Sequence, residues 1–247
     1  MMKNLYKVSC RKIYKNTFYK IGLIIAAGVT YIFTAGYISL GQIIDTMPLV
    51  QKMIFIGAAM IPFFTIFPPI IICSEYGDGV MKNKVISGYS QKQIFLGGML
   101  AQLSACAFMW IIHVIAGIIA GVRPDGKDVL SMLAMLLAVL AYTAVIYAIT
   151  FRLRKPVRSF IVDMLLLNAC YNVLIFGNLL GMYLKGFALK ILALVYNANA
   201  MGQWFVLNGL ADEDQDPGRI PQIILSVLLV GLAVLIGTMK VNKRDLV

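Results

Sequence analysis

The chain has 247 residues, of which 60% are hydrophobic and 13% charged, and its formal net charge is +11. A soluble domain carries about 25% charged residues, so this composition excludes an ordinary soluble globular protein. The apolar residues gather in runs of about 20 residues, the length that crosses a hydrocarbon core about 30 Å thick. Because the cations lie between these runs, we interpret the charge as membrane orientation and contact with lipid headgroups, and we expect no nucleic-acid binding.

Residues 2–19 are predicted to form a basic amphipathic helix in the membrane interface. Cations spaced four residues apart share one face of such a helix, and apolar residues, Leu5 and Ile13 among them, fall on the other side. The basic face consists of Lys3, Lys7, Arg11 and Lys15. We expect the apolar side to lie at the acyl boundary of the bilayer; the alternative is a solvated charged tail.

The sequence predicts an all-α integral membrane protein with six spans in one transmembrane domain, 1–247. The approximate spans are 21–40, 53–73, 94–121, 130–151, 159–181 and 221–239. Proline removes a backbone donor, so Pro62, Pro68 and Pro69 predict a kinked or broken second span. Residues 182–210 are too apolar for a loop in water, yet polar residues interrupt them. This pattern favours short re-entrant helices before the last span, with a seventh span as the alternative.

The distribution of cations predicts the orientation. Sixteen of the 22 lysines and arginines fall in the segments 1–20, 74–93, 152–158 and 240–247. These segments alternate along the chain with segments that hold the other six. Because cation-rich loops stay on the cytoplasmic side, both termini are expected in the cytoplasm of a bacterial cell whose plasma membrane holds the chain.

No motif predicts catalysis, a metal site or a cofactor in this chain. The segment 121–128 nearly matches a phosphate-binding loop, but Asp128 stands where that loop needs Ser or Thr, and no strand precedes it. The one histidine, His113, has no second histidine or carboxylate three or four residues away, so we expect it to be packed and hydrogen-bonded. We therefore expect that the chain is not an enzyme.

Polar residues inside the fifth span are few. Asp163 is expected to form an ion pair with Arg158 or Arg154; the functional alternative is contact with a cationic group at the mouth of a pathway. Asn168 and Asn172 lie four residues apart. Because amides in lipid are costly, we expect them to face protein or a wet cavity, either as links between helices or as pathway lining.

The segment between the second and third spans contains a short predicted helix, Val80 to Ser87, bounded by Gly79 and Gly88. Ser90 can cap the span that follows. A short helix parallel to the membrane in the cytoplasm is suited to docking a partner protein. The alternative is an ordinary loop.

This segment resembles the corresponding loop of permease subunits of the type-2 ABC exporter family. There an acidic residue leaves the second span, Gly-Thr and a short coupling helix follow, and Ser-Arg-x-x-Ile opens the third span. The matching residues are Glu75, Gly79, Ser90, Gln93 and Ile94, whereas Val80 and Gln91 replace the usual Thr and Arg. The ending Lys243-Arg244-Asp245-Leu246 and the order of interfacial helix, six spans and re-entrant helices are similar too.

The resemblance implies a complex of two permeases, either two copies or this chain with a homologous permease, and two separate ABC ATPase subunits that bind ATP and magnesium. The residues implied in coupling to the ATPase are Glu75, Gly79, Val80, Met81, Lys82, Lys84, Ser87 and Ser90. Those implied in a pathway are Pro62, Thr65, Asp163, Asn168 and Asn172. The expected cargo is an amphipathic or hydrophobic peptide such as a toxin. Export of drugs or lipids is one alternative, and a non-transporting sensor or immunity protein is another.

Overall fold

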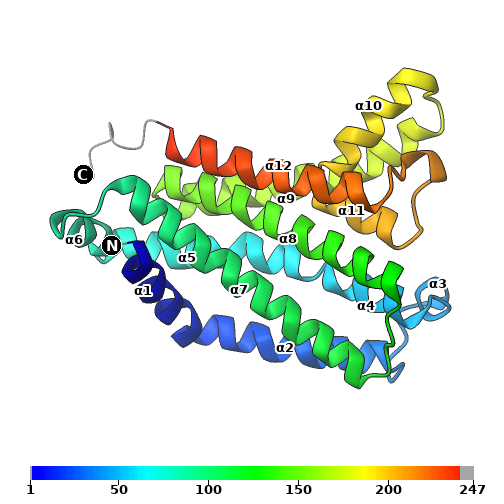
Figure 1. Cartoon of the computed structure of the whole chain (residues 1–247), viewed down its shortest axis with the longest axis horizontal. Coiled ribbons are helices and arrows are strands. Elements are labelled where there is room, and N and C mark those ends of the chain that lie inside the picture. Colours follow the sequence, from blue (N-terminus) through cyan, green and yellow to red (C-terminus); the bar gives the residue numbers. More distant parts are fainter. Residues whose placement is uncertain (1, 240–247) are drawn as a thin grey trace.

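In the computed structural model, which describes residues 2–239, the described chain is all-helical and has no strand. Six helical segments are long and apolar enough to cross a membrane, and they run side by side as one bundle (Figure 1). They are α2 (Thr17–Thr34), α4 with α5 (Leu49–Gly57 and Met60–Gly77), α7 (Gln91–Ile119), α8 (Gly126–Leu153), α9 (Pro156–Gly181) and α12 (Arg219–Thr238).

Short helices lie at the two ends of the bundle. They are α1 (Met2–Lys15), α3 (Gln42–Asp45), α6 (Val80–Ile86), α10 (Gly186–Asn197), α11 (Ala200–Leu207) and the 3₁₀ helix η1 (Glu213–Gln215). Figure 1 shows α1 and α6 together at one end, with α3 at the other. At that second end α10 projects sideways from the bundle.

The first two helices have different limits from those predicted. The helix expected over 2–19 ends at Lys15, because the Asn16 side chain accepts a hydrogen bond from the backbone N–H of Tyr19 and caps a new helix. The span expected over 21–40 therefore begins at Thr17 and ends at Thr34. Gly36, with φ +79°, lies in the turn that follows.

The apolar face of α1 packs on protein. Leu5 and Ile13 are 4% and 2% exposed, and the Leu5 Cβ lies 3.0 Å from the position that a Cβ on Gly97 of α7 would take. The expectation that these side chains lie at the acyl boundary is therefore wrong. The cations of the predicted basic face, by contrast, are exposed: Lys3, Lys7, Arg11 and Lys15.

The second span is broken, as its prolines predicted. Its helix is interrupted at Ala58 and Ala59, and around this break three backbone N–H groups bond to the carbonyl three residues earlier. Pro62 has no N–H with which to reach the Ala58 carbonyl, and the N–H of Ile61 takes its place at 2.9 Å. On the α4 side of the break, the Phe55 carbonyl accepts a hydrogen bond from the indole N–H of Trp204 on α11 at 3.0 Å.

Side-chain caps define the starts of α7 and α8. Ser90 forms a capping box with Gln93, which confirms the predicted cap. Asp125 and Asp128 form the same reciprocal arrangement at the start of α8. The Asp128 carboxylate thus completes a helix cap, at the position where a phosphate-binding loop would need a hydroxyl.

The centre of the bundle is α8, which packs against α5, α7, α9, α11 and α12. Its hydroxyls find partners across the core: Tyr142 and Thr65 of α5 have their oxygens 2.6 Å apart. His113 on α7 is 1% exposed, with Nδ1 2.6 Å from Thr30 Oγ1 and Nε2 3.1 Å from the Met53 carbonyl. His113 is therefore packed and hydrogen-bonded, as expected. Of the six spans, α9 is the least buried.

Candidate functional site

The candidate site is the end of the bundle where α6 meets α1, α5 and α7 (Figure 1). Helix α6 spans Val80–Ile86, one residue shorter than predicted. The glycines at its two sides, Gly79 and Gly88, have φ of +70° and +87°, a backbone region that residues with a Cβ rarely adopt. Two glycines thus permit the sharp turns that separate this helix from α5 and α7.

A buried carboxylate connects α6 to the bundle. Glu75, in the last turn of α5, is 7% exposed, and its Oε2 accepts a hydrogen bond from Lys84 Nζ of α6 at 2.7 Å. Its Oε1 lies 3.7 Å from Lys12 Nζ of α1. Lys12 also donates to Ser74 Oγ at 3.1 Å. One carboxylate therefore joins three helices through two cations.

The two sides of α6 differ. Met81 is 3% exposed and belongs to an apolar cluster with Leu5, Phe95 and Phe151. Opposite it, Ile86 is 74% exposed. The other exposed residues on or next to α6 are Lys82, Asn83 and Ser87. Of the residues expected to act in coupling, Glu75, Met81 and Lys84 thus attach the helix, whereas Lys82 and Ser87 face outward and Ser90 caps α7.

A contact that the sequence did not predict lies beside this site. Arg154, which ends α8, has its guanidinium carbon 5.7 Å from the ring centre of Tyr76, within the range of a cation–π interaction. The Tyr76 hydroxyl donates to the Phe151 carbonyl at 3.3 Å. The last turn of α5 is therefore attached to α8 as well as to α6. Tyr76 and Arg154 are 78 residues apart in the sequence, so no local pattern could predict that they are in contact.

The residues expected in a pathway do not meet in one place. Thr65 is fully buried against α8, and Pro62 lies beside the break of the second span. Asn168 and Asn172 are exposed and bond to each other, with Nδ2 of Asn172 2.7 Å from Oδ1 of Asn168. They face out from the single chain and not into it.

Asp163 is placed differently from the prediction. It is fully buried, and its Oδ2 accepts a hydrogen bond from Thr150 of α8 at 2.7 Å. None of the ion pairs among residues 2–239 includes it, so the expected pair with Arg158 or Arg154 is wrong. The rotation of a helix explains this: Asp163 lies on the side of α9 that meets α8, whereas Arg158, five residues earlier, is roughly 140° away around the helix and exposed.

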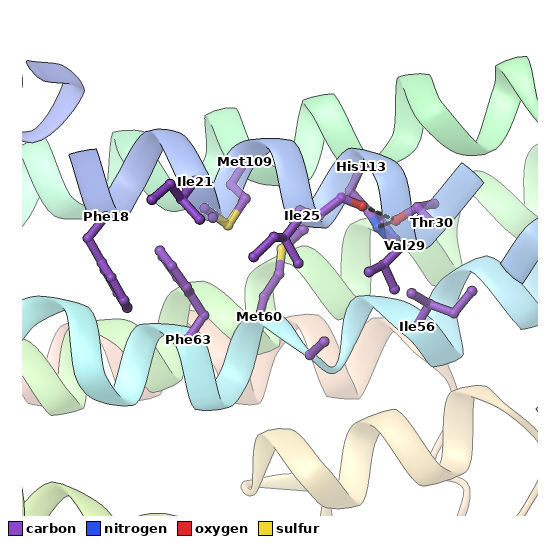
Figure 2. A pocket seen from close by; sticks show the side chains of 13 residues that line it. Phe18, Ile21, Ile25, Val29, Thr30, Ile56, Met60, Phe63, Met109 and His113 are labelled. Carbon is purple, nitrogen blue, oxygen red and sulfur yellow. Dashed lines mark hydrogen bonds between the residues drawn. The ribbon is translucent and has the colours of Figure 1, made fainter. Parts of the chain in front are cut away.

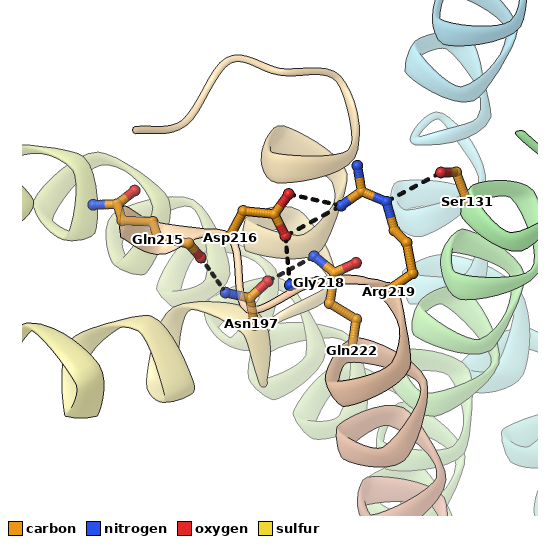
Figure 3. Close-up of polar contacts among 7 residues, drawn as sticks. All are labelled: Ser131, Asn197, Gln215, Asp216, Gly218, Arg219 and Gln222. Atoms are coloured by element: carbon orange, nitrogen blue, oxygen red, sulfur yellow. Dashed lines mark hydrogen bonds and ion pairs between the residues drawn. The ribbon is translucent and has the colours of Figure 1, made fainter. Parts of the chain in front are cut away.

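At the opposite end, a buried amide network joins α10, α11 and α12. Figure 3 shows the part of it that connects Asn197, Gln215 and Gln222. Asn197 Nδ2 donates to the Gln215 carbonyl at 2.8 Å, and Gln222 Nε2 donates to Asn197 Oδ1 at 2.9 Å. Gln203 Nε2 donates to the Asn197 carbonyl at 2.6 Å and to Ser226 Oγ at 3.0 Å. One sign of this network is visible in the sequence: Gln222 and Ser226 lie four residues apart in a mostly apolar span.

Over residues 2–239 the geometry thus defines an all-helical bundle with six segments able to span a membrane. One end of this bundle carries a short helix, α6, that ion pairs and apolar contacts attach to it. Comparison of the chain with protein-family models and with curated proteins gives no match. The ending Lys243-Arg244-Asp245-Leu246 lies outside the described residues.

Proposed function

We propose that this chain is the transmembrane permease subunit of an ATP-driven ABC exporter. The observation that carries the proposal is the attachment of α6 through Glu75 to both α5 and α1. A helix that receives a push from another protein can move a span only if it is joined to it by contacts stronger than thermal motion. The 2.7 Å contact between Lys84 and Glu75, both poorly exposed, is a contact of that kind.

The exposed side of α6 suits a docking surface for a separate ATPase. Ile86 offers an apolar anchor surrounded by Lys82, Asn83 and Ser87, and buried apolar anchors with polar rims are typical of protein interfaces. In this proposal two ATPase subunits bind ATP and magnesium, and their closure pushes on α6. In this proposal α6 and both termini lie in the cytoplasm of a bacterial cell, with α1 at the surface of the plasma membrane, because cation-rich segments stay on the cytoplasmic side.

The proposal assigns α10 and α11 as re-entrant helices of the outer leaflet. The exposed apolar side chains of α10 include Phe187, 79% exposed, and Leu194, 58% exposed, which fits contact with lipid. The amide network that ties them to α12 satisfies polar groups that would otherwise be unpaired in an apolar medium.

A second permease copy, or a homologous permease, would complete the pathway. The exposed amides of Asn168 and Asn172 are costly in lipid, and a second chain or a wet pathway at α9 would remove that cost. The cargo we propose is an amphipathic peptide, such as a toxin. Beyond its first turn, the exposed side of α9 is apolar except for a few amides, and such a surface matches an amphipathic molecule. Export of drugs or lipids stays the alternative.

Co-purification tests the function. The tagged chain is isolated from its host in mild detergent, and a soluble ATPase is expected to accompany it in equal amount. Ile86→Asp is expected to remove the ATPase. Ile43→Asp is the matched control, because Ile43 is 72% exposed but lies on α3 at the other end of the bundle (Figure 1). A chain that carries no ATPase even after cross-linking would refute the proposal and favour a non-transporting sensor or immunity protein.

A further inference from the structure

A groove runs along the outside of the bundle between α2, the broken second span and α7 (Figure 2). Its cavity volume is about 170 Å³, smaller than the about 300–1,000 Å³ of sites that enclose a whole small molecule. Its lining is almost entirely apolar. Two of its wall residues on α2, Ile21 and Ile25, are 49% and 56% exposed, so the groove is open along its length to whatever surrounds the bundle.

Small residues create the hollow. Gly22 and Ala26 line it on α2, and Ala59 lines it at the break of the second span. A Cβ on Gly22 would lie 2.4 Å from Phe63 Cε2, so the glycine allows the Phe63 ring to lie directly against α2. The break at Ala58 and Ala59 leaves Ala59 exposed where a continuous helix of larger residues would close the groove.

The length and depth of the groove match one acyl chain. From Phe18 to Val29 there are eleven helical rises, or about 16 Å, and one leaflet of a ~30 Å hydrocarbon core is about 15 Å deep. The far end closes at Thr30 and His113, whose polar atoms already contact one another and the Ala26 and Met53 carbonyls. An occupant therefore finds no open polar group there, which favours hydrocarbon over a polar ligand.

The charge at the near end indicates the headgroup. Exposed Lys15 lies three residues before Phe18, where the groove begins. The neighbouring α1 carries further lysines and an arginine but no acidic residue. Cations near a membrane surface attract anionic lipids by about 1 kcal/mol each.

We propose that the groove binds an anionic phospholipid from the leaflet that meets α1. One acyl chain lies between α2 and the broken second span, and the phosphate lies beside Lys15. This lipid would fill the hollow that the break creates and hold α2 against α5. The proposal depends on the chain lying in a bilayer and is independent of transport.

Native mass spectrometry of the delipidated protein in detergent tests this site, with dioleoyl phosphatidylglycerol or dioleoyl phosphatidylcholine added as the probe. Phosphatidylglycerol is expected to bind first and more tightly. Ala59→Phe fills the groove from an exposed position and is expected to abolish the tightest binding event. Ala188→Phe, at an exposed alanine on α10, is the matched control and should retain it.

The headgroup contact is tested separately. Lys15→Gln is expected to weaken phosphatidylglycerol binding about fivefold, the factor that corresponds to one cation near an anionic surface. Lys127→Gln, on the far end of the bundle, should change nothing. Equal melting temperatures without lipid establish that each variant is folded. If Ala59→Phe binds phosphatidylglycerol as tightly as Ala188→Phe does, the groove is not the site; if phosphatidylcholine binds equally well, the assignment of an anionic headgroup is wrong.

Discussion

Replacement of Glu75 by glutamine tests the attachment of α6 most directly. The substitution keeps the shape of the side chain and removes its charge, while Lys84, whose side chain is 11% exposed, stays charged beside it. The glutamine oxygen can still accept a hydrogen bond from Lys84 Nζ. The change therefore isolates the electrostatic part of the contact between α5 and α6.

The structure sets the size of the effect. A hydrogen bond to a charged partner contributes about 1.5–3 kcal/mol, and the second ion pair, to the partly exposed Lys12 at 3.7 Å, adds at most about 1 kcal/mol. The weaker hydrogen bond that the neutral glutamine oxygen still accepts from Lys84 offsets about 1 kcal/mol. We therefore expect a loss of about 2 kcal/mol in the free energy of unfolding, or about 4–8 °C in melting temperature for a chain of this size.

A double-mutant cycle measures the contact itself. Glu75→Gln, Lys84→Gln and the double variant are melted in detergent, and the expected coupling energy is about 1.5 kcal/mol. The control is the more exposed pair Asp216 and Arg219, whose side chains are 35% and 26% exposed and whose coupling should be about 0.5 kcal/mol or less. Equal couplings at the two pairs would show that Glu75 does not hold α6, and the proposed mechanical link would lose its support.

Two further predictions concern packing and buried hydroxyls. Gly237→Ala should lower the stability by about 1–3 kcal/mol, because its Cβ would lie 2.0 Å from Phe95 Cζ; Gly231→Ala on the same helix meets nothing within 4 Å and should leave the melting temperature equal or higher. Thr65→Val should cost about 1–3 kcal/mol by leaving the Tyr142 hydroxyl without its partner, and adding Tyr142→Phe should restore most of the loss. Thermal melting of the purified variants measures both, and a Thr65→Val, Tyr142→Phe double variant less stable than Thr65→Val alone would contradict the second.

Local chemistry was the part of the fold that the sequence predicted well. The Ser90 cap, the glycines around α6 and the break near Pro62 depend on residues within one or two turns of each other, and the structure has all of them. The predicted end of the first span, residue 40, was wrong. The residues after Thr34 are still apolar, so hydropathy does not reveal that the helix ends before the turn at Gly36.

Contacts between distant segments were less predictable. Glu75 was singled out from the sequence, but its partners Lys84 and Lys12 depend on how α1 and α6 fold back on α5. The error at Asp163 has the same origin. Nearby arginines in sequence suggested an ion pair, but the rotation of α9 directs the carboxylate to Thr150 on α8.

The break in the second span divides it between two sets of neighbours. On one side, α5 is attached to α6 through Glu75 and to α8 through Thr65. On the other, α4 is attached to α7 and α11, since its Met53 and Phe55 carbonyls contact the His113 and Trp204 rings. The two halves can therefore tilt by different amounts about the break. A displacement of α5 at the α6 end of the bundle need not produce an equal displacement of α4 at the other end.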